Sequence, residues 1–132
     1  MAVKFKAILR GEPGVVGGGV KKYYAIAVSS GEHSLLKLST YISKATTVNK
    51  ADVLAVLSSL VEFMIIELSD GAIIRLGELG SLRLSLHSKG MDSKEDVNAS
   101  CIKDATIVFT PGSELKDTLK TLSFEKINET EE

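Results

Sequence analysis

The spacing of apolar residues changes several times along the chain, and each change predicts a different element. Residues 3–9 and 20–28 are rich in β-forming side chains, which predicts two short strands. Between them, residues 11–19 contain Pro13 and the triple glycine 17–19, a composition typical of a flexible loop. Residues 1–31 are therefore expected to form an N-terminal β segment.

Two helices are predicted next, because apolar residues recur at helical spacing after residue 33. The first begins near Ser34, which can serve as its N-cap. The second begins at Asn49, carries Asp52 where negative charge suits a helix N-terminus, and ends near Gly71. Its apolar stripe consists of Val53, Leu57, Leu60, Val61, Met64, Ile65 and Leu68. One small neighbouring helix cannot cover so wide a face, so the stripe predicts burial in a second copy of the chain.

From residue 72 the period is two, which predicts a three-stranded sheet. Its strands are expected at residues 73–76, 81–87 and 101–109, followed by a short amphipathic helix at 113–122. The first two strands are joined by a tight turn bounded by Gly77 and Gly80. In the second strand Leu82, Leu84 and Leu86 lie on one face.

Charge is balanced overall and uneven along the chain. There are 16 Lys and Arg against 17 Asp and Glu, a net charge of −1. Residues 1–31 hold five basic side chains and one acid, whereas residues 72–112 hold five of each. The total argues weakly against nucleic-acid binding, although clustering matters more than the sum. The chain has no apolar run of membrane-spanning length and no secretory signal, so a cytoplasmic protein is expected.

Two local motifs carry a resemblance to a known family. Residues 74–82, IRLGELGSL, resemble the glycine turn of the bacterial HU/IHF histone-like proteins, and residues 109–116, FTPGSELK, resemble their junction into the final helix. Both motifs occur in the family's order and at the expected separation, within a match covering residues 33 to about 122. The segment 1–31 resembles the N-terminal addition of HU-related proteins from Bacteroidetes-type bacteria.

The resemblance implies an α+β fold in which a helical homodimer base carries a three-stranded sheet and a protruding β-ribbon arm, plus the N-terminal β extension. It also implies binding of duplex DNA with little sequence preference, by cations on the sheet and arm and by a wedge residue at each arm tip. The residues that would take these roles are Arg75, Arg83, Lys89, Met91, Lys94 and Lys103.

The arm departs from the family pattern in two respects. Its tip, residues 88–94, has no proline, so Met91 is either the wedge or an exposed loop residue. The arm cations are also opposed by nearby acids, so they either bind phosphate weakly or form a solvated ribbon face. The opposing acids are Asp92, Glu95, Asp96 and Asp104.

The N-terminal segment offers a second positive patch. It comprises Lys4, Lys6, Lys21 and Lys22. If the two strands pair as a hairpin, Lys4 and Lys6 share one face, where they either supplement the arm or keep the extra sheet soluble. Cys101 is more typical of a buried strand residue than of a nucleophile, and neither histidine has metal-ligand spacing.

The sequence therefore predicts an architectural, nucleoid-associated protein of the bacterial cytoplasm that binds and bends duplex DNA as a homodimer. No enzymatic activity, cofactor, metal, small-molecule substrate or membrane partner is expected. The predicted domains are the extension at 1–31, the DNA-binding domain at 32–127 and an acidic tail at 128–132. The alternative is an HU-fold protein-interaction module that has lost most of its DNA affinity.

Overall fold

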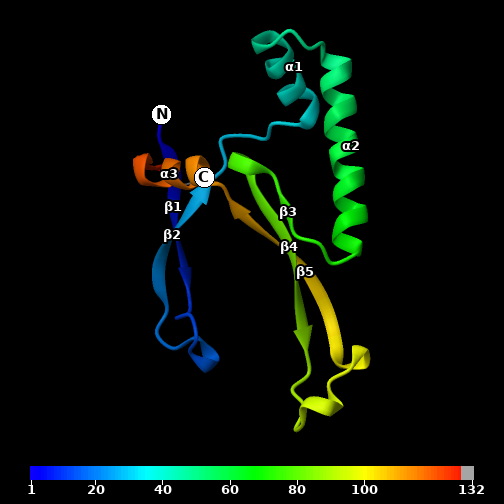
Figure 1. Ribbon diagram of the computed structural model, residues 1–132. Coiled ribbons are helices and arrows are strands. Elements are labelled where there is room, and N and C mark those ends of the chain that lie inside the picture. Colours follow the sequence, from blue (N-terminus) through cyan, green and yellow to red (C-terminus); the bar gives the residue numbers. More distant parts are fainter. Residues whose placement is uncertain (129–132) are drawn as a thin grey trace. The chain divides into compact units, whose positions relative to one another are not determined.

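The computed structural model describes residues 1–128, so residues 129–132 of the predicted tail lie outside the described part of the chain. The chain forms two compact units, whose elements are labelled in Figure 1. The central unit is Leu35–Thr118, and the terminal unit combines Met1–Ser34 with the chain from Leu119 onward. The domain boundary at residue 31 stays a prediction. The structure adds that the C-terminal segment groups with the N-terminal one.

Two helices begin the central unit, α1 (Leu35–Ala45) and α2 (Lys50–Ser69). The Asn49 side chain accepts a hydrogen bond from the Asp52 backbone N–H at 2.9 Å, which confirms the predicted N-cap of α2. Gly71, just after α2, has φ +81°, the left-handed conformation in which glycine commonly ends a helix. Thus α1 begins, and α2 begins and ends, close to the residues that the local signals predict.

The apolar side chains of α2 are largely uncovered. Val53 and Leu68 are buried, whereas Phe63 is 64% exposed and Ile66 is 61% exposed. Phe63 and Ile66 lie outside the predicted stripe, so α2 is apolar around most of its circumference and not on one face alone. A helix with this composition needs to be covered by other protein elements to be stable in water.

The central sheet contains three antiparallel strands in the order β3, β4, β5. Their bounds are β3 Ile74–Arg75, β4 Gly80–Ser88 and β5 Ile102–Pro111. Leu82, Leu84 and Leu86 lie opposite Phe109, Ile107 and Ala105, which confirms that the three leucines share one apolar face. Leu84 and Ile107 also line an open hollow beside Leu68 of α2.

The two family-like motifs meet in space. A Cβ atom at Gly112 would collide with the backbone of Glu78, so only glycine allows this approach. The Glu78 carboxylate accepts a hydrogen bond from the Glu114 backbone N–H at 3.3 Å, and thereby caps the N-terminus of α3 (Ser113–Thr118). The helix predicted to reach residue 122 is shorter, because a 3-10 turn, Leu119–Thr121, replaces its last part.

The terminal unit is a second three-stranded sheet, in the order β2, β1, β6. Its strands are β1 Val3–Arg10, β2 Lys22–Val28 and β6 Phe124–Lys126. The predicted hairpin is present, since β1 and β2 pair antiparallel from Lys4 opposite Val28 to Arg10 opposite Lys22. Strand β6 was not predicted. It pairs with β1 in parallel, and the Val3 N–H donates to the Ser123 carbonyl at 2.8 Å.

Within residues 1–128 the fold is a mixed α+β structure with two small sheets and three α-helices, in agreement with the predicted class. The dimeric arrangement stays a prediction. None of the helices in the described residues has both the length and the hydropathy that crossing a membrane requires.

Candidate nucleic-acid interface

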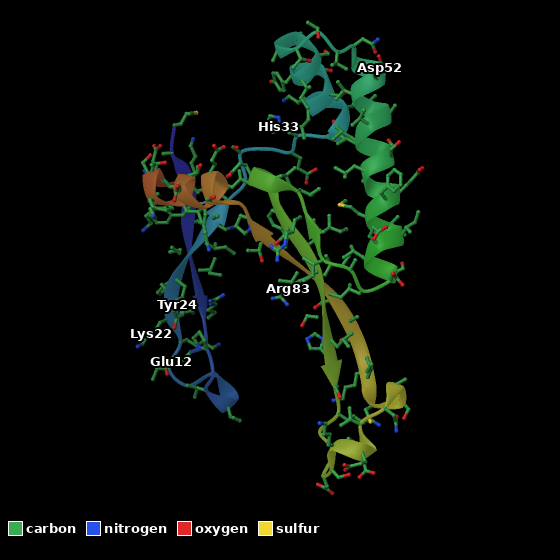
Figure 2. All side chains as sticks on the ribbon, in the orientation of Figure 1. Glu12, Lys22, Tyr24, His33, Asp52 and Arg83 are labelled. Atoms are coloured by element: carbon green, nitrogen blue, oxygen red, sulfur yellow. The ribbon has the colours of Figure 1, made fainter. Side chains whose placement is uncertain are left out.

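The polar face of the central sheet collects two of the predicted DNA contacts. Arg75 of β3 lies opposite Ser81 of β4, so it shares the face on which Arg83 follows two residues later. Both arginines are exposed, and Figure 2 labels Arg83 on its strand. Arg75 also borders an open hollow of about 310 Å³ that is lined mainly by the two glycine motifs.

Hydroxyl groups accompany these arginines. Across the ladder Ser85 lies opposite Thr106, and Ser81 lies opposite Thr110, on the same face as Arg83. Neutral hydroxyls are common donors to phosphate oxygens in DNA complexes. They were not among the predicted contacts, because only the pairing of β4 with β5 brings the two threonines to this face.

The arm loop between β4 and β5 contains more regular structure than its polar composition suggests. It contains two 3-10 turns, Lys94–Asp96 and Ala99–Cys101. Cys101 is buried, as predicted, but in the second of these turns and not in the strand, and its Sγ lies 3.5 Å from the Asp96 carbonyl oxygen. The Asn98 side chain accepts from the Ser100 N–H at 3.0 Å. The Cys101 side chain is thus the buried centre of the arm loop.

The three predicted arm lysines are all exposed. Lys89 and Lys94 lie in the loop, and Lys103 is the extra residue of a bulge, because Ser88 pairs with Ile102 while His87 pairs with Asp104. None of these lysines forms a salt bridge within the described part of the chain. Their ammonium groups are therefore accessible to an anionic partner.

The acids of the arm are exposed as well. Asp92, Glu95 and Asp96 lie in the loop beside Lys94. Asp104 instead contacts His87 directly across the two strands. In this position the Asp104 carboxylate is engaged with the His87 ring, so the acids that oppose phosphate most directly are the three in the loop.

Two apolar side chains are exposed in the arm loop. Met91, the predicted wedge, is 43% exposed, and Val97 is 58% exposed. Val97 was not predicted, because it lies beyond the arm tip at residues 88–94. Both side chains are therefore candidates for contact with bases.

The N-terminal cations are brought together only in part. The register places Lys4, Lys6 and Lys22 on one face of the terminal sheet, while Lys21 lies just before β2. Arg10 joins that face, opposite Lys22, and its guanidinium lies 4.9 Å from the ring centre of Tyr24. Figure 2 shows Lys22 and Tyr24 on this hairpin together with Glu12, which forms a salt bridge with Lys22 at 3.3 Å.

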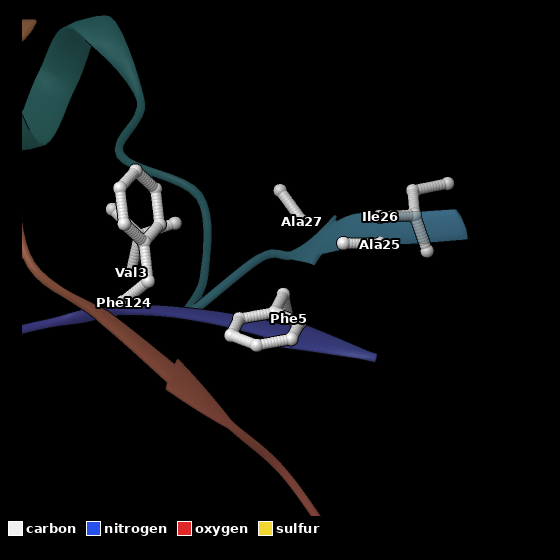
Figure 3. A pocket seen from close by; sticks show the side chains of 6 residues that line it. All are labelled: Val3, Phe5, Ala25, Ile26, Ala27 and Phe124. Carbon is white, nitrogen blue, oxygen red and sulfur yellow. The ribbon is translucent and has the colours of Figure 1, made fainter. Parts of the chain in front are cut away.

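The described residues offer little support for a metal site or for a pocket with titratable side chains. No group of three or more His, Cys, Asp or Glu side chains within residues 1–128 is arranged to hold a metal ion. An apolar hollow of the terminal sheet, about 360 Å³, is open to solvent and lined by Val3, Phe5, Ala25, Ile26, Ala27 and Phe124 (Figure 3). It contains no titratable side chain.

The chain is similar to HU-domain proteins in sequence and to a bacterial protein of solved structure in fold. The family model HU-HIG, described as an HU domain fused to wHTH, Ig, or Glycine-rich motif, matches residues 1–126. No curated protein matches the chain. Among solved structures, the chain is similar to the crystal structure of a "Putative bacterial DNA binding protein" from Bacteroides vulgatus ATCC 8482, with a TM-score of 0.64 and 11% identity. The match covers 98% of this chain and 50% of that one, so the chain spans about half the length of that protein.

Proposed function

Because this chain belongs to the HU-HIG family of HU-domain proteins, we propose that it binds double-stranded DNA with little dependence on sequence. The observation that carries the proposal is the set of exposed cations on the polar sheet face and the arm. These are Arg75, Arg83, Lys89, Lys94 and Lys103. Such side chains contact phosphates, which are the same in every sequence. The protein would act as an architectural component of the bacterial nucleoid, in the cytoplasm.

The arm supplies the geometry for this contact. A two-stranded β ribbon can enter a groove of duplex DNA, and an apolar tip residue can separate base steps and bend the duplex. Met91 and Val97 are the exposed apolar residues of the arm loop, so we assign bending to them. The three loop acids reduce the attraction for phosphate, so binding is expected to be weak and to fall steeply with salt.

A homodimer is the second part of the proposal, and uncovered apolar surface supports it. The chain exposes 10,968 Å², whereas a compact monomer of its mass, 14.1 kDa, would expose about 6,700 Å². Packing the two units against each other would remove at most about 1,500 Å² of that excess, the usual upper size of an interdomain interface. The exposed faces of α2 and of the β4–β5 leucines are the surfaces that a second copy would cover.

Sedimentation equilibrium tests the dimer. At micromolar concentration, the molecular mass is expected to be twice the chain mass of 14.1 kDa, and dilution should lower the unfolding temperature because folding and association are coupled. A folded, stable species of single-chain mass would refute the dimer.

The DNA proposal is tested by titrating a fluorescent duplex at several salt concentrations. The K89Q/K94Q variant removes four cations per dimer, so the slope of log affinity against log salt should flatten by up to about 3.6. The matched control K89R/K94R retains the charges and should bind like the wild type. If K89Q/K94Q keeps the wild-type affinity and slope, the arm is not the DNA site. If the intact chain does not bind duplex even at low salt, the protein-interaction alternative is the better account.

A further inference from the structure

The terminal sheet has two chemically different faces. On β1, Val3, Phe5, Ala7 and Leu9 alternate with Lys4, Lys6, Ile8 and Arg10. Because successive residues of a strand point to opposite faces, the first set belongs to an apolar face and the second to a face that carries three cations. We call the second the basic face; it consists of Lys4, Lys6 and Arg10 of β1 and Lys22 of β2.

The cations of β1 lie along one side of the strand. Lys4 and Lys6 are two residues apart, which places their Cα atoms about 7 Å from each other, and Arg10 lies about 20 Å from Lys4 along the strand. Each strand of duplex DNA carries a phosphate every 3.4 Å or so along the helix axis, a rise of about 20 Å for six phosphates. The row is therefore long enough to follow several phosphates.

Side chains of β2 lie beside the cations of β1. Val28 lies opposite Lys4, and Ile26 lies opposite Lys6. The lysine stems can pack along these aliphatic side chains while their ammonium groups remain at the surface. At the far end, Arg10 lies over the Tyr24 ring at 4.9 Å, which restrains the guanidinium.

Two acids oppose cations of this face. Glu12 forms a salt bridge with Lys22 at 3.3 Å, so these two charges offset each other. Glu125 of β6 lies opposite Lys4 in the parallel ladder. The four cations Lys4, Lys6, Arg10 and Lys22 outnumber these two acids. The arm, by comparison, carries as many acids as bases.

The opposite face is mainly apolar, with Lys126 of β6 placed opposite Phe5. Phe5 and Phe124 border its open apolar hollow, in which Ala25 and Ala27 leave space (Figure 3). An antiparallel sheet with one apolar face typically packs that apolar face against protein and leaves the other face in solvent. The basic face is thus the side of this sheet that is suited to a charged partner.

We propose that the basic face is a second phosphate-binding surface, which contacts the backbone of duplex DNA independently of the arm. This inference rests on the proposed function for the identity of the ligand. The contact consists of Lys4, Lys6 and Arg10, with Glu125 as an opposing charge that limits its strength.

The test is a DNA titration with the full chain. The K4Q/K6Q/R10Q variant should weaken duplex binding about tenfold at low salt and flatten the salt slope by about 3 per chain. The matched variant K4R/K6R/R10K retains every charge and should bind like the wild type. E125Q should act in the opposite direction and strengthen binding about twofold. Circular dichroism melting of each variant verifies that the sheet is intact.

Failure of the basic face and failure of the arm would give different results with these variants. If K4Q/K6Q/R10Q binds with the wild-type affinity and slope while K89Q/K94Q is impaired, the basic face is rejected and the arm function stands. If K89Q/K94Q is unimpaired while K4Q/K6Q/R10Q is impaired, the arm is rejected and the basic face stands. If K4R/K6R/R10K is as weak as the glutamine variant, these residues act through folding and not through charge, which also overturns the inference.

Discussion

The arm and the β1–β2 hairpin are both antiparallel two-stranded ribbons, yet they differ in charge and in the chemistry of their ends. The arm, β4 to β5, has four cations and four acids, whereas the hairpin, residues 3–28, has five cations and one acid. The arm loop is built around the buried Cys101, while the hairpin loop contains Pro13 and a run of glycines with positive φ. In this chain the ribbon that resembles a DNA-binding arm is not the more basic ribbon.

This difference shows that shape and electrostatics are separable in such a fold. The arm retains the length and loop of a groove-binding ribbon but has nearly balanced charge, so its affinity for phosphate depends on where its acids lie. The hairpin carries more net positive charge, which suits contact with the phosphate backbone.

The same glycine substitution should have very different effects in the two ribbons. Gly80 at the start of β4 has φ +132°, and a Cβ there would collide with the Thr110 carbonyl oxygen and the Phe109 ring. Gly80→Ala should therefore lower the free energy of unfolding by about 3 kcal/mol or more. Gly14 in the hairpin loop has φ +79° and open space around it, so Gly14→Ala should cost only about 1 kcal/mol. Urea denaturation measures both, and equal losses would contradict this account.

Neutralising the loop acids should make the arm resemble the hairpin electrostatically. The D92N/E95Q/D96N variant removes three negative charges per chain next to Lys94, and we expect duplex affinity at low salt to rise about tenfold. Anisotropy titration measures the change, and it should shrink as salt is raised. An unchanged affinity would mean that DNA does not approach the arm loop.

The buried thiol distinguishes the two loops. Cys101→Ser places a hydroxyl in the core of the arm loop and should destabilise that loop by about 1 kcal/mol, seen as faster amide exchange around residues 89–101. Val16 of the hairpin loop is 102% exposed, so Val16→Ser is the matched control and should leave exchange unchanged. If both loops exchange at wild-type rates, Cys101 does not organise the arm.

The smallest effect is expected at the arm's apolar residues. Met91→Ala and Val97→Ala should reduce DNA bending, measured by energy transfer between the ends of a labelled duplex, with little change in the salt slope, because an apolar wedge releases no counterions. Comparison of the two variants identifies which residue is the wedge. If neither alters the bend, both are ordinary loop residues.

Much of the central unit follows from local signals. The cap at Asn49, the glycine after α2 and the alternation of Leu82, Leu84 and Leu86 each depend on residues close in sequence, and the structure reproduces all three. The glycine motifs were also predicted as turns. Their contact, in which Glu78 caps α3 and excludes a side chain at Gly112, was not foreseen because it joins residues more than thirty positions apart.

The residues of the candidate site also divide into those that were predicted and those that only the structure showed. The arm cations were assigned through the resemblance to the HU/IHF family, and the structure leaves them exposed on the sheet face and in the arm. The sequence missed Thr106 and Thr110, which join Arg83 only through the pairing of β4 with β5, and it missed Val97, whose exposure depends on how the loop is folded. Whether these residues contact DNA stays a prediction.

What the sequence determined by itself is the set of elements and their order, because helical and strand periodicity are local properties of the chain. Tertiary structure alone decided that Phe124–Lys126 pairs in parallel with β1, since three residues carry no recognisable period and their partner lies at the other end of the chain. That pairing sets Glu125 beside Lys4, and the β1–β2 register sets Lys22 opposite Arg10. Register is a long-range property, and a shift of one residue would have placed Glu125 and Lys22 on the face opposite to these β1 cations.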